Sequence, residues 1–308
     1  GEPVYNCIIW LDRRTNACCQ ELNKDLKNAE NLHNKSGQFI TSFFPPTKVS
    51  WILDNVPGMR ERAEKGELCF GTVDTWLFYN MTGKKRHVAE MSNAARTLFF
   101  NIHTLEWDDE LIDIFGVPKS MLPPEILPSD GCFGDLTGAF DRDIPIMGSL
   151  GDQQAALFGH QCFEAGQTKA TLGTAGLVSM NTGKEPMIHP AQGATLGWNC
   201  KLGRAYALEG GFYFCGGIFE WLQKQMRFIE NPAQSADVAF SVDDTMGVYF
   251  STTFFGATAS VVNDFARGTI VGLNVAADTR HIVRAALESI GYQVRAVASG
   301  MTRAAQDA

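Results

Sequence analysis

The sequence predicts a two-domain α/β protein, for three reasons. Apolar runs typical of strands alternate along the chain with segments whose apolar residues recur at helical spacing. The 308 residues, 45% of them hydrophobic, suffice for two domains with sizeable cores. Short glycine-rich strands begin after Gly166, so we place the boundary at residues 160–166, between a first domain of residues 1–162 and a second of 163–308. Mixed strands and helices in this order imply a cleft between the domains.

Local patterns predict the elements of the first domain. Helices are predicted at residues 15–27, 51–67, 73–81, 105–115 and 154–163. A turn followed by an apolar strand is predicted within residues 1–11, a core strand at 144–150, and an ordered proline-rich loop at 118–128. The first helix places Leu22 and Leu26 on one face, and Pro57-Gly58 interrupts the second. Gly83 and Gly116 end the next two helices as C-cap glycines do.

The second domain is predicted to mix short strands with two helices. Frequent glycines separate the apolar segments, which favours strands and tight turns over long helices. Strands are predicted within residues 168–180 and at 204–208, 248–255 and 269–273. Helices are predicted at residues 212–229 and 281–305, the latter rich in alanine.

The composition argues against several classes of partner. A net charge of -8 and a pI near 5.3 are unlike nucleic-acid-binding domains, which concentrate Lys and Arg, so we expect no nucleic-acid partner. The eight cysteines form no CxxC pair and no metal-ligand spacing, which is typical of a reduced, cytoplasmic protein. No charge-free apolar run predicts a membrane span. The first residue is Gly1 rather than Met, so targeting information before it stays open.

One carboxylate is placed where a reaction could use it. Residues 144–151 (IPIMGSLG) lead directly into Asp152 and Gln153. A strand, a glycine-bearing turn and a helical start would set Asp152 at the carboxyl end of a strand, where open α/β sheets bind ligands. An aspartate there can accept a proton from a substrate hydroxyl. Taken alone, the pattern fits better with Asp152 as the N-cap of a helix that begins at Gln153.

Several further segments decide between these interpretations, because in this order they resemble the FGGY family of carbohydrate kinases. The resemblance extends from Gly1 to about Arg303 and is closest to the members that phosphorylate glycerol. The matching segments are WLDRRT (10–15), FFPPTKVSWILDN (43–55), GTVDTWL (71–77), NIHTLEWDD (101–109), GDQQAALFG (151–159), GTIVGL (268–273) and HIVRAALE (281–288).

The resemblance implies a fold and a reaction. The fold would consist of two ribonuclease-H-like domains of the actin and hexokinase type, which close over sugar and ATP across an interdomain cleft. The first domain would hold the substrate side and the second the nucleotide side. The reaction would be the ATP- and Mg²⁺-dependent phosphorylation of glycerol, or of a similar small polyol, to glycerol 3-phosphate and ADP. Asp152 would be the general base and would lie near the metal, and Gln153 would orient the polyol.

The resemblance also assigns binding residues. Trp10 offers a flat apolar face to the carbon side of a polyol, although pattern alone fits a core tryptophan equally well. Its neighbours Arg13 and Arg14 we interpret as ion-pair partners rather than phosphate ligands. Small residues in a turn let backbone N–H groups approach phosphate oxygens. The further candidates are Phe43 and Leu177 for the substrate and Gly173, Thr174 and Gly216 for the nucleotide.

The sequence departs from the family at several places. Phe43 stands where a tyrosine usually presents a hydroxyl to glycerol, and Leu177 where an aromatic side chain usually lines the pocket. Ala89-Glu90 replaces a Thr-Asp pair, and residues 256–262 replace a GLGAPYW run. The family's opening phosphate loop and closing adenosine motif have no counterpart. We therefore expect this chain to be a fragment in which both domains are incomplete, and we expect its activity by itself to be impaired.

Three alternatives stay open at this point. The chain could belong to an FGGY kinase that acts on another sugar or polyol, because two pocket positions differ. It could also be a catalytically inactive, kinase-like binding or regulatory protein. A nucleotide-dependent dehydrogenase is disfavoured because no GxGxxG follows a strand with an acidic residue at the proper distance. Family members often form dimers or tetramers, so a homo-oligomer is compatible with the sequence.

Overall fold

The computed structural model describes residues 1–138, 140–254 and 266–307, so the altered run at residues 256–262 lies outside the described residues. The chain forms two compact units. The first comprises Gly1–Gln167 and Asn181–Leu208, and the second Thr168–Met180 and Glu209–Ala308.

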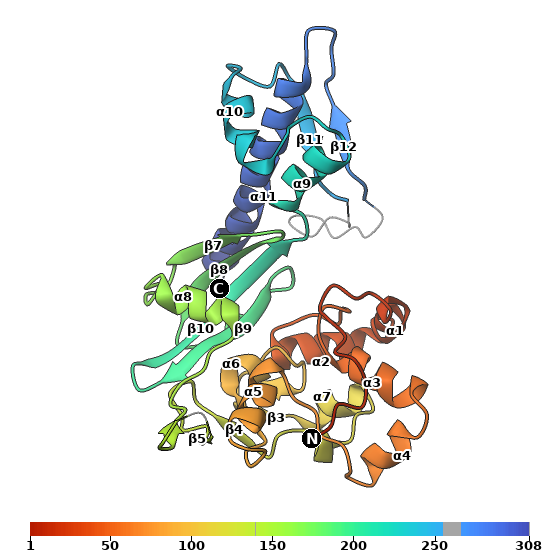
Figure 1. The fold of residues 1–308 in the computed structure, drawn as a ribbon, viewed down its shortest axis with the longest axis vertical. Helices are drawn as coiled ribbons and strands as arrows, with labels where there is room; N and C mark the ends of the chain where they lie inside the picture. The colour runs from red at the N-terminus through yellow and green to blue at the C-terminus, as the bar shows by residue number, and fades with distance from the viewer. Residues whose placement is uncertain (139, 255–265, 308) are drawn as a thin grey trace. The chain divides into compact units, whose positions relative to one another are not determined.

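The first unit opens with residues 1–15, which contain no helix or strand, so the strand predicted at residues 1–11 is wrong. Its helices are α1 (Asn16–Leu22), α2 (Leu26–Ser36), α3 (Pro46–Asn55), α4 (Met59–Glu64), α5 (Val73–Met81), α6 (Met91–Ala94), α7 (Asp109–Ile114) and α8 (Asp152–Gly159), with a 3-10 turn at Lys119–Met121 (Figure 1). Helices α1 to α4 and α7 contribute buried side chains to one core, which includes Leu32, Phe44, Leu53, Ala63, Phe99 and Leu111.

Four predicted helices of this unit needed correction. In place of the helix predicted at residues 51–67 are α3, which begins at Pro46, and α4, which ends at Glu64; the helix predicted at residues 154–163 is α8, Asp152–Gly159. The helix expected at residues 15–27 is broken, because the Asp25 carboxylate accepts a 3.1 Å hydrogen bond from the Asn28 N–H and so starts α2. Leu26 is consequently 77% exposed, while Leu22 packs against the core. The helix expected at residues 105–115 begins only at α7, where Asp108 is the N-cap. The break at Pro57-Gly58 and the range of α5 are confirmed.

The strands of the first unit are short. β1 (Val88–Glu90) pairs in parallel with β4 (Glu125–Leu127), whereas β2 (Phe100–Asn101) with β3 (Glu106–Trp107) and β5 (Asp135–Leu136) with β6 (Ile144–Pro145) are antiparallel. The core strand predicted at residues 144–150 is therefore wrong beyond Pro145. A strand persists only where a partner continues the ladder, and β5 is two residues long. Met147 is 52% exposed, so this segment is not core.

A four-stranded sheet follows α8. Its order is β7 (Thr168–Leu172), β8 (Gly176–Gly183), β10 (Gly203–Phe212) and β9 (Gly193–Cys200). β7 and β8 form an antiparallel hairpin in which Leu172 faces Gly176 and residues 173–175 make the turn. The strands predicted within residues 168–180 and at 204–208 are confirmed, and β9 was not predicted.

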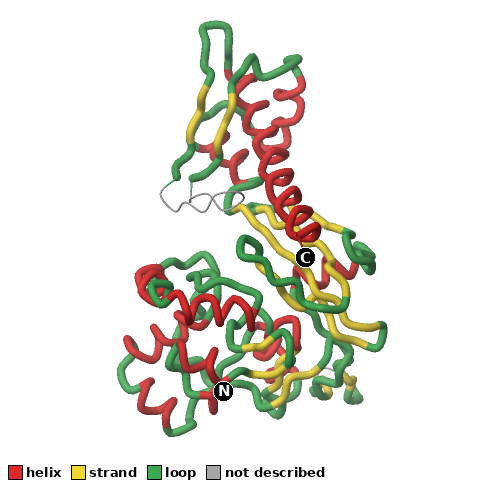
Figure 2. The backbone as a smooth tube through the Cα atoms, turned by 180° about the vertical axis from the view of Figure 1, so that it is seen from behind, coloured by secondary structure: helices red, strands yellow, loops and turns green. Residues whose placement is uncertain are grey.

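The second unit continues with α9 (Gly217–Lys224), a 3-10 turn (Pro232–Gln234), α10 (Ser235–Phe240), β11 (Tyr249–Ser251), β12 (Thr269–Val271) and α11 (Thr279–Asp307). The long α11 lies beside α10 and the antiparallel β11–β12 pair (Figure 2). These elements enclose a second core that includes Ile218, Leu222, Val248, Phe250, Val283 and Ala286. The helix predicted at residues 212–229 is shorter because Phe212 ends β10.

Candidate active site

Asp152 lies at the first position of α8 with its side chain exposed. Gly151 is the N-cap residue, and no side chain caps this helix, so the interpretation of Asp152 as a helix cap is wrong. Among the described residues, the partner of its carboxylate is the Gln153 amide, whose Nε2 donates a 3.0 Å hydrogen bond to Oδ2. An exposed carboxylate with such a partner can accept a proton from an incoming hydroxyl.

Both ends of α8 are fixed to the rest of the first unit. At the N-terminus, the Gly151 N–H donates a 2.9 Å hydrogen bond to the Ser92 hydroxyl. At the C-terminus, the rings of Phe158 and Trp198 meet edge to face with centroids 5.3 Å apart, and Leu157 is buried in the same cluster. The helix that carries Asp152 is therefore anchored at both ends.

A fully buried carboxylate, Glu90, organises the contacts behind Gly151. It accepts hydrogen bonds from both the N–H and the hydroxyl of Ser92, from the N–H and the amide of Asn93, and from the Ser129 hydroxyl. Burial raises the pKa of Glu90, and these hydrogen bonds oppose that rise. The glutamate that replaces the family's Asp at this position is therefore a buried carboxylate that accepts five hydrogen bonds.

Asp74 connects this group to α5. Its Oδ2 accepts a 3.1 Å hydrogen bond from the Glu90 N–H, and its Oδ1 accepts from the Thr72 hydroxyl. Burial raises the pKa of Asp74 as well. The backbone N–H of Glu90 thus connects two buried carboxylates. Asp74 lies in a segment that matches the family, whereas Glu90 departs from it.

The predicted substrate side chains Trp10 and Phe43 contact each other. Their rings meet edge to face with centroids 5.6 Å apart, and Trp10 is 44% exposed, so it is not a core tryptophan. The Arg96 guanidinium lies 5.9 Å from the Phe43 ring and 5.3 Å from the Phe44 ring. Trp10 and Phe43 thus form a partly exposed aromatic surface, and the Arg96 guanidinium lies next to the Phe43 ring.

The segment that contains Trp10 is held by a buried lysine. Lys48 is 4% exposed, and its Nζ donates a 2.7 Å hydrogen bond to the Ile9 carbonyl. Burial lowers the pKa of Lys48. Further along, Arg14 pairs with Asp12 through two nitrogens at 3.0 and 2.8 Å, which confirms the ion-pair interpretation of Arg14.

One short segment, residues 90–96, joins the two parts of this site. Arg96 at its end contacts the Phe43 ring, and Ser92 near its start holds the residue before Asp152. Hydrogen bonds and packing therefore connect the predicted polyol-side aromatics to the predicted base through α6. Sequence reasoning did not predict Ser92, Asn93, Arg96 or Ser129. The only signal was that polar residues occupy a segment that is otherwise apolar.

In the second unit, the predicted nucleotide residues come together. The Gly216 N–H donates a 2.7 Å hydrogen bond to the Gly173 carbonyl, and the Cys215 and Gly217 N–H groups donate to Thr174 O at 2.8 and 3.4 Å. The turn of the β7–β8 hairpin is therefore tied to the start of α9. Gly173 and Thr174 are exposed, so phosphate oxygens can approach this turn. Helix N-termini and small-residue turns favour such anions.

Leu177 follows that turn. It is half-buried in β8 opposite Thr171. Its Cδ1 lies 3.2 Å from where a Cβ on Gly211 would stand, so Leu177 packs toward the backbone of β10.

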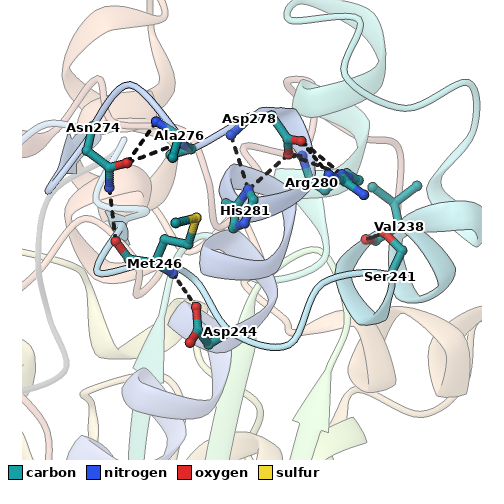
Figure 3. Close-up of polar contacts among 10 residues, drawn as sticks. Val238, Ser241, Asp244, Met246, Asn274, Ala276, Asp278, Arg280 and His281 are labelled. Carbon is teal, nitrogen blue, oxygen red and sulfur yellow. Dashed lines mark hydrogen bonds and ion pairs between the residues drawn. The ribbon is translucent and has the colours of Figure 1, made fainter.

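The matching segment HIVRAALE (281–288) lies at the start of α11 (Figure 3). The Asp278 carboxylate accepts from the Arg280 N–H at 2.9 Å and contacts His281 Nδ1 at 2.9 Å, while the Asp278 N–H donates to the same Nδ1 at 3.1 Å. Neighbouring Asn274 joins this end to the loop at Met246 through a 3.1 Å hydrogen bond. His281 is 7% exposed and its role here is to hold the helix end.

Two searches of the described residues bear on metals and membranes. In residues 1–138, 140–254 and 266–307, no three or more His, Cys, Asp or Glu side chains gather in a way that could hold a metal ion. None of the helices in those ranges has the length and apolar character needed to cross a membrane.

Comparison with known proteins gives a consistent family. The model of the FGGY family of carbohydrate kinases, N-terminal domain, matches residues 1–159, and the C-terminal domain model matches residues 168–308. Glycerol kinase 2 of Thermotoga maritima is 44% identical over 306 residues, and glycerol kinase of Bacillus subtilis 45% identical over 305 residues. Each alignment covers 98% of this chain and 61% of the relative, so the chain spans about three fifths of their length.

Solved structures agree with this. The crystal structure of Plasmodium falciparum glycerol kinase with ADP matches with a TM-score of 0.90 at 31% identity, over 99% of this chain and 61% of that one. A ligand-bound xylulose kinase from Lactobacillus acidophilus matches with a TM-score of 0.78 at 23% identity, over 97% and 60%, which is a likeness of fold. The matches confirm the expected α/β fold of the ribonuclease-H-like, actin and hexokinase type.

Proposed function

The chain belongs to the FGGY family of carbohydrate kinases, and we propose that it carries the catalytic base and substrate residues for ATP-dependent phosphorylation of glycerol to glycerol 3-phosphate. The observation that supports this most is the position of Asp152, exposed at the start of a helix that is anchored at both ends. Phosphoryl transfer needs positioning and charge stabilisation more than covalent chemistry, and a fixed carboxylate supplies the proton acceptor.

In the proposed reaction, a terminal hydroxyl of glycerol attacks the γ-phosphorus of ATP. The bond between that oxygen and the γ-phosphorus forms as the bond from the γ-phosphorus to the β–γ bridging oxygen breaks. Asp152 accepts the hydroxyl proton, and ADP leaves with the bridging oxygen. Gln153, whose amide contacts Asp152 at 3.0 Å, orients both the carboxylate and the polyol.

The substrate side rests on the aromatic pair. Trp10 presents its exposed face to the carbon chain of the polyol, and Phe43 supports it from the edge. A flat apolar face leaves the hydroxyl groups of a small polyol free for polar partners. We propose that Leu177 lines the pocket from β8.

The nucleotide side rests on the joined turn. We propose that Gly173, Thr174 and Gly216 contact the phosphates of ATP through backbone N–H groups and the threonine hydroxyl. Mg²⁺, when bound with ATP, neutralises charge on the phosphate oxygens. The hard carboxylate oxygens of Asp152 fit this ion, which usually keeps several waters, so the proposed role of Asp152 toward it is indirect.

Asp152→Asn tests the proposed function directly. In the longest native form of the protein that contains this sequence, we expect kcat for glycerol phosphorylation to fall by ~10²- to 10⁴-fold. Asp109→Asn is the matched control, because Asp109 is likewise exposed and is the first residue of α7. Unchanged turnover in Asp152→Asn, with an intact fold, would refute the proposed base.

A second candidate is an FGGY kinase that acts on a different polyol or sugar. It is favoured by the ring of Phe43, which has no hydroxyl to offer glycerol, and by Leu177, which stands where an aromatic side chain usually lines the pocket. Turnover of glycerol, a tetritol and a pentulose by the same preparation separates the two. Binding without turnover of any of them would favour an inactive, regulatory protein.

Three further proposals concern the setting of the activity. We propose residues 1–162 as the substrate-side domain and 163–308 as the nucleotide-side domain, a division that falls between the ranges of the two family models. We propose a cytoplasmic location, which is supported by eight cysteines that are all free thiols. A homo-oligomer stays a prediction, checked by light scattering.

A further inference from the structure

We infer that Ser92 and Glu90 are positioning residues for Asp152, which fix the start of α8 through a hydrogen-bonded relay from a buried carboxylate to the Gly151 N–H. The inference rests on the proposed function, because it assumes that the position of Asp152 matters for phosphoryl transfer. Neither residue touches the substrate in this account. Both act through the backbone that precedes the base.

The first step of the relay is the orientation of the Ser92 hydroxyl. Its Oγ lies 2.6 Å from Glu90 Oε2 and 2.9 Å from the Gly151 nitrogen. A carboxylate can only accept, so the hydroxyl proton is donated to Glu90 and a lone pair remains for the Gly151 N–H. By accepting the hydroxyl proton, Glu90 therefore orients the Ser92 hydroxyl so that its oxygen can accept from the Gly151 N–H.

The second step is a parallel connection through Ser129. Its hydroxyl donates to Glu90 Oε1 at 2.8 Å, and its carbonyl accepts from the Ser149 N–H at 3.0 Å. The Ser129 N–H donates in turn to the Asn199 carbonyl in β9 at 2.8 Å. Two amides among the three residues before Asp152, those of Ser149 and Gly151, thus donate to serines whose hydroxyls are hydrogen-bonded to Glu90.

The third step is steric. A Cβ on Gly151 would stand 2.5 Å from Oε1 of Gln154, which is 3% exposed, so glycine lets the backbone approach this buried amide closely. Gly151 has a φ of -57° and a ψ of 151°, values open to any residue, so the requirement is space and not backbone strain. The backbone just before Asp152 is thus held by hydrogen bonds at Ser149 and Gly151, and by the packing of Leu150 against the cluster that contains Leu157.

A purely structural role is the competing explanation, because Glu90 is also the N-cap of α6. The two explanations differ in what they predict for catalysis. Loss of a cap lowers stability alone, whereas loss of the relay moves Asp152 relative to the hydroxyl and lowers kcat at constant affinity for ATP. A displacement of ~1 Å at a reacting group can cost ~10²-fold in rate.

Ser92→Ala is the decisive variant, with Thr82→Val as its matched control. Each change removes one buried hydroxyl that both donates and accepts: Thr82 Oγ1 donates to the Phe78 carbonyl at 2.7 Å and accepts from the Arg86 N–H at 3.2 Å. Glu90→Gln is the second variant. It replaces one carboxylate oxygen by an amide N–H₂, which cannot accept from the hydroxyl or N–H groups that now donate to Glu90. All three are made in the longest native form of the protein that contains this sequence.

We expect Ser92→Ala and Glu90→Gln to lower kcat for glycerol at least ~10-fold with the KM for ATP within ~2-fold of wild type. Hydrogen exchange of the Gly151 amide should become faster in both variants. Thr82→Val should lose comparable stability while keeping kcat and Gly151 exchange. Equal effects of Ser92→Ala and Thr82→Val on kcat, or unchanged Gly151 exchange in Ser92→Ala, would overturn the inference. If wild type itself does not phosphorylate glycerol, the proposed function fails. Hydrogen exchange of the Gly151 amide then decides by itself whether Ser92 and Glu90 hold the start of α8.

Discussion

The Gly216 N–H donates a 2.7 Å hydrogen bond to the Gly173 carbonyl, and a Cβ on Gly216 would stand 2.8 Å from that same oxygen. Because the clashing atom belongs to the backbone, no side-chain rotation can relieve the contact. The β7–β8 turn and the start of α9 can therefore lie this close only with glycine at position 216. The proposed phosphate contacts depend on that approach.

Gly216→Ala should weaken nucleotide binding more than glycerol binding. The added methyl pushes the Gly173–Thr174 turn away from α9, so we expect the KM for ATP to rise at least ~10-fold with the KM for glycerol near wild type. Gly291→Ala is the control, because a Cβ there meets open space within α11 and should stabilise the helix by ~1 kcal/mol. Steady-state kinetics with each substrate varied would contradict the prediction if both KM values moved together.

The sequence predicted best those elements whose ends are encoded locally. Helix α5 has the predicted range, and the break at Pro57-Gly58 and the long α11 are where the pattern put them. Proline, glycine and helical spacing act over a few residues, so one sequence suffices to read them. The strands predicted at residues 1–11 and 144–150 failed because a strand needs a partner, and apolar runs do not reveal whether one is present.

The site shows the same division. Asp152 could be proposed as the base from a contiguous segment that resembles the family, and Gly173 and Gly216, which were proposed separately for the nucleotide, contact each other. Ser92 could not be identified, because its partner Gly151 lies 59 positions away. Glu90 was noted only as a departure from the family, and nothing in the sequence indicated that five hydrogen bonds converge on it.

Lys48→Met should loosen the segment that carries Trp10. The variant keeps most of the buried stem but leaves the Ile9 carbonyl without its 2.7 Å donor, so we expect the free energy of unfolding to fall by ~1–3 kcal/mol. The KM for glycerol should rise, because Trp10 follows Ile9 directly. Lys65→Met, which removes an exposed pair with Glu61, is the control and should cost under ~1 kcal/mol in urea unfolding. Equal losses would contradict a special role for Lys48.

The pairing of Asp12 with Arg14 predicts a specific pH dependence. Hydrogen bonds from Arg14 lower the pKa of Asp12 to about 2, below the ~3.9 of an unfolded chain. A lowered carboxyl pKa stabilises the folded state above the unfolded pKa, so this contribution is present above pH ~4 and is lost as the pH falls toward ~2. Titration of the Asp12 side-chain carbon by NMR measures the midpoint.

Arg14→Gln should return that midpoint toward ~4, whereas Arg13→Gln, which leaves the pair in place, should not move it. Asp12 is half-buried, but its hydrogen bonds with Arg14 are exposed to solvent, so we expect the pKa shift to shrink as salt is added. A midpoint near ~4 in the unaltered protein would show that the pair does not persist in solution.

Asp278→Ala should destabilise the second unit from the start of α11. The variant removes the acceptor of the Arg280 N–H and the partner of His281 Nδ1 together, so the free energy of unfolding should fall by ~1 kcal/mol, as for other helix caps. Asp237→Ala, an exposed first-turn change in α10, should stay within ~0.5 kcal/mol of wild type. Because His281 is buried behind Asp278, exchange of the first-turn amides of α11 should quicken only in Asp278→Ala. Equal unfolding energies for the two variants would show that this end of α11 is held by its packing against α10 and β11 alone.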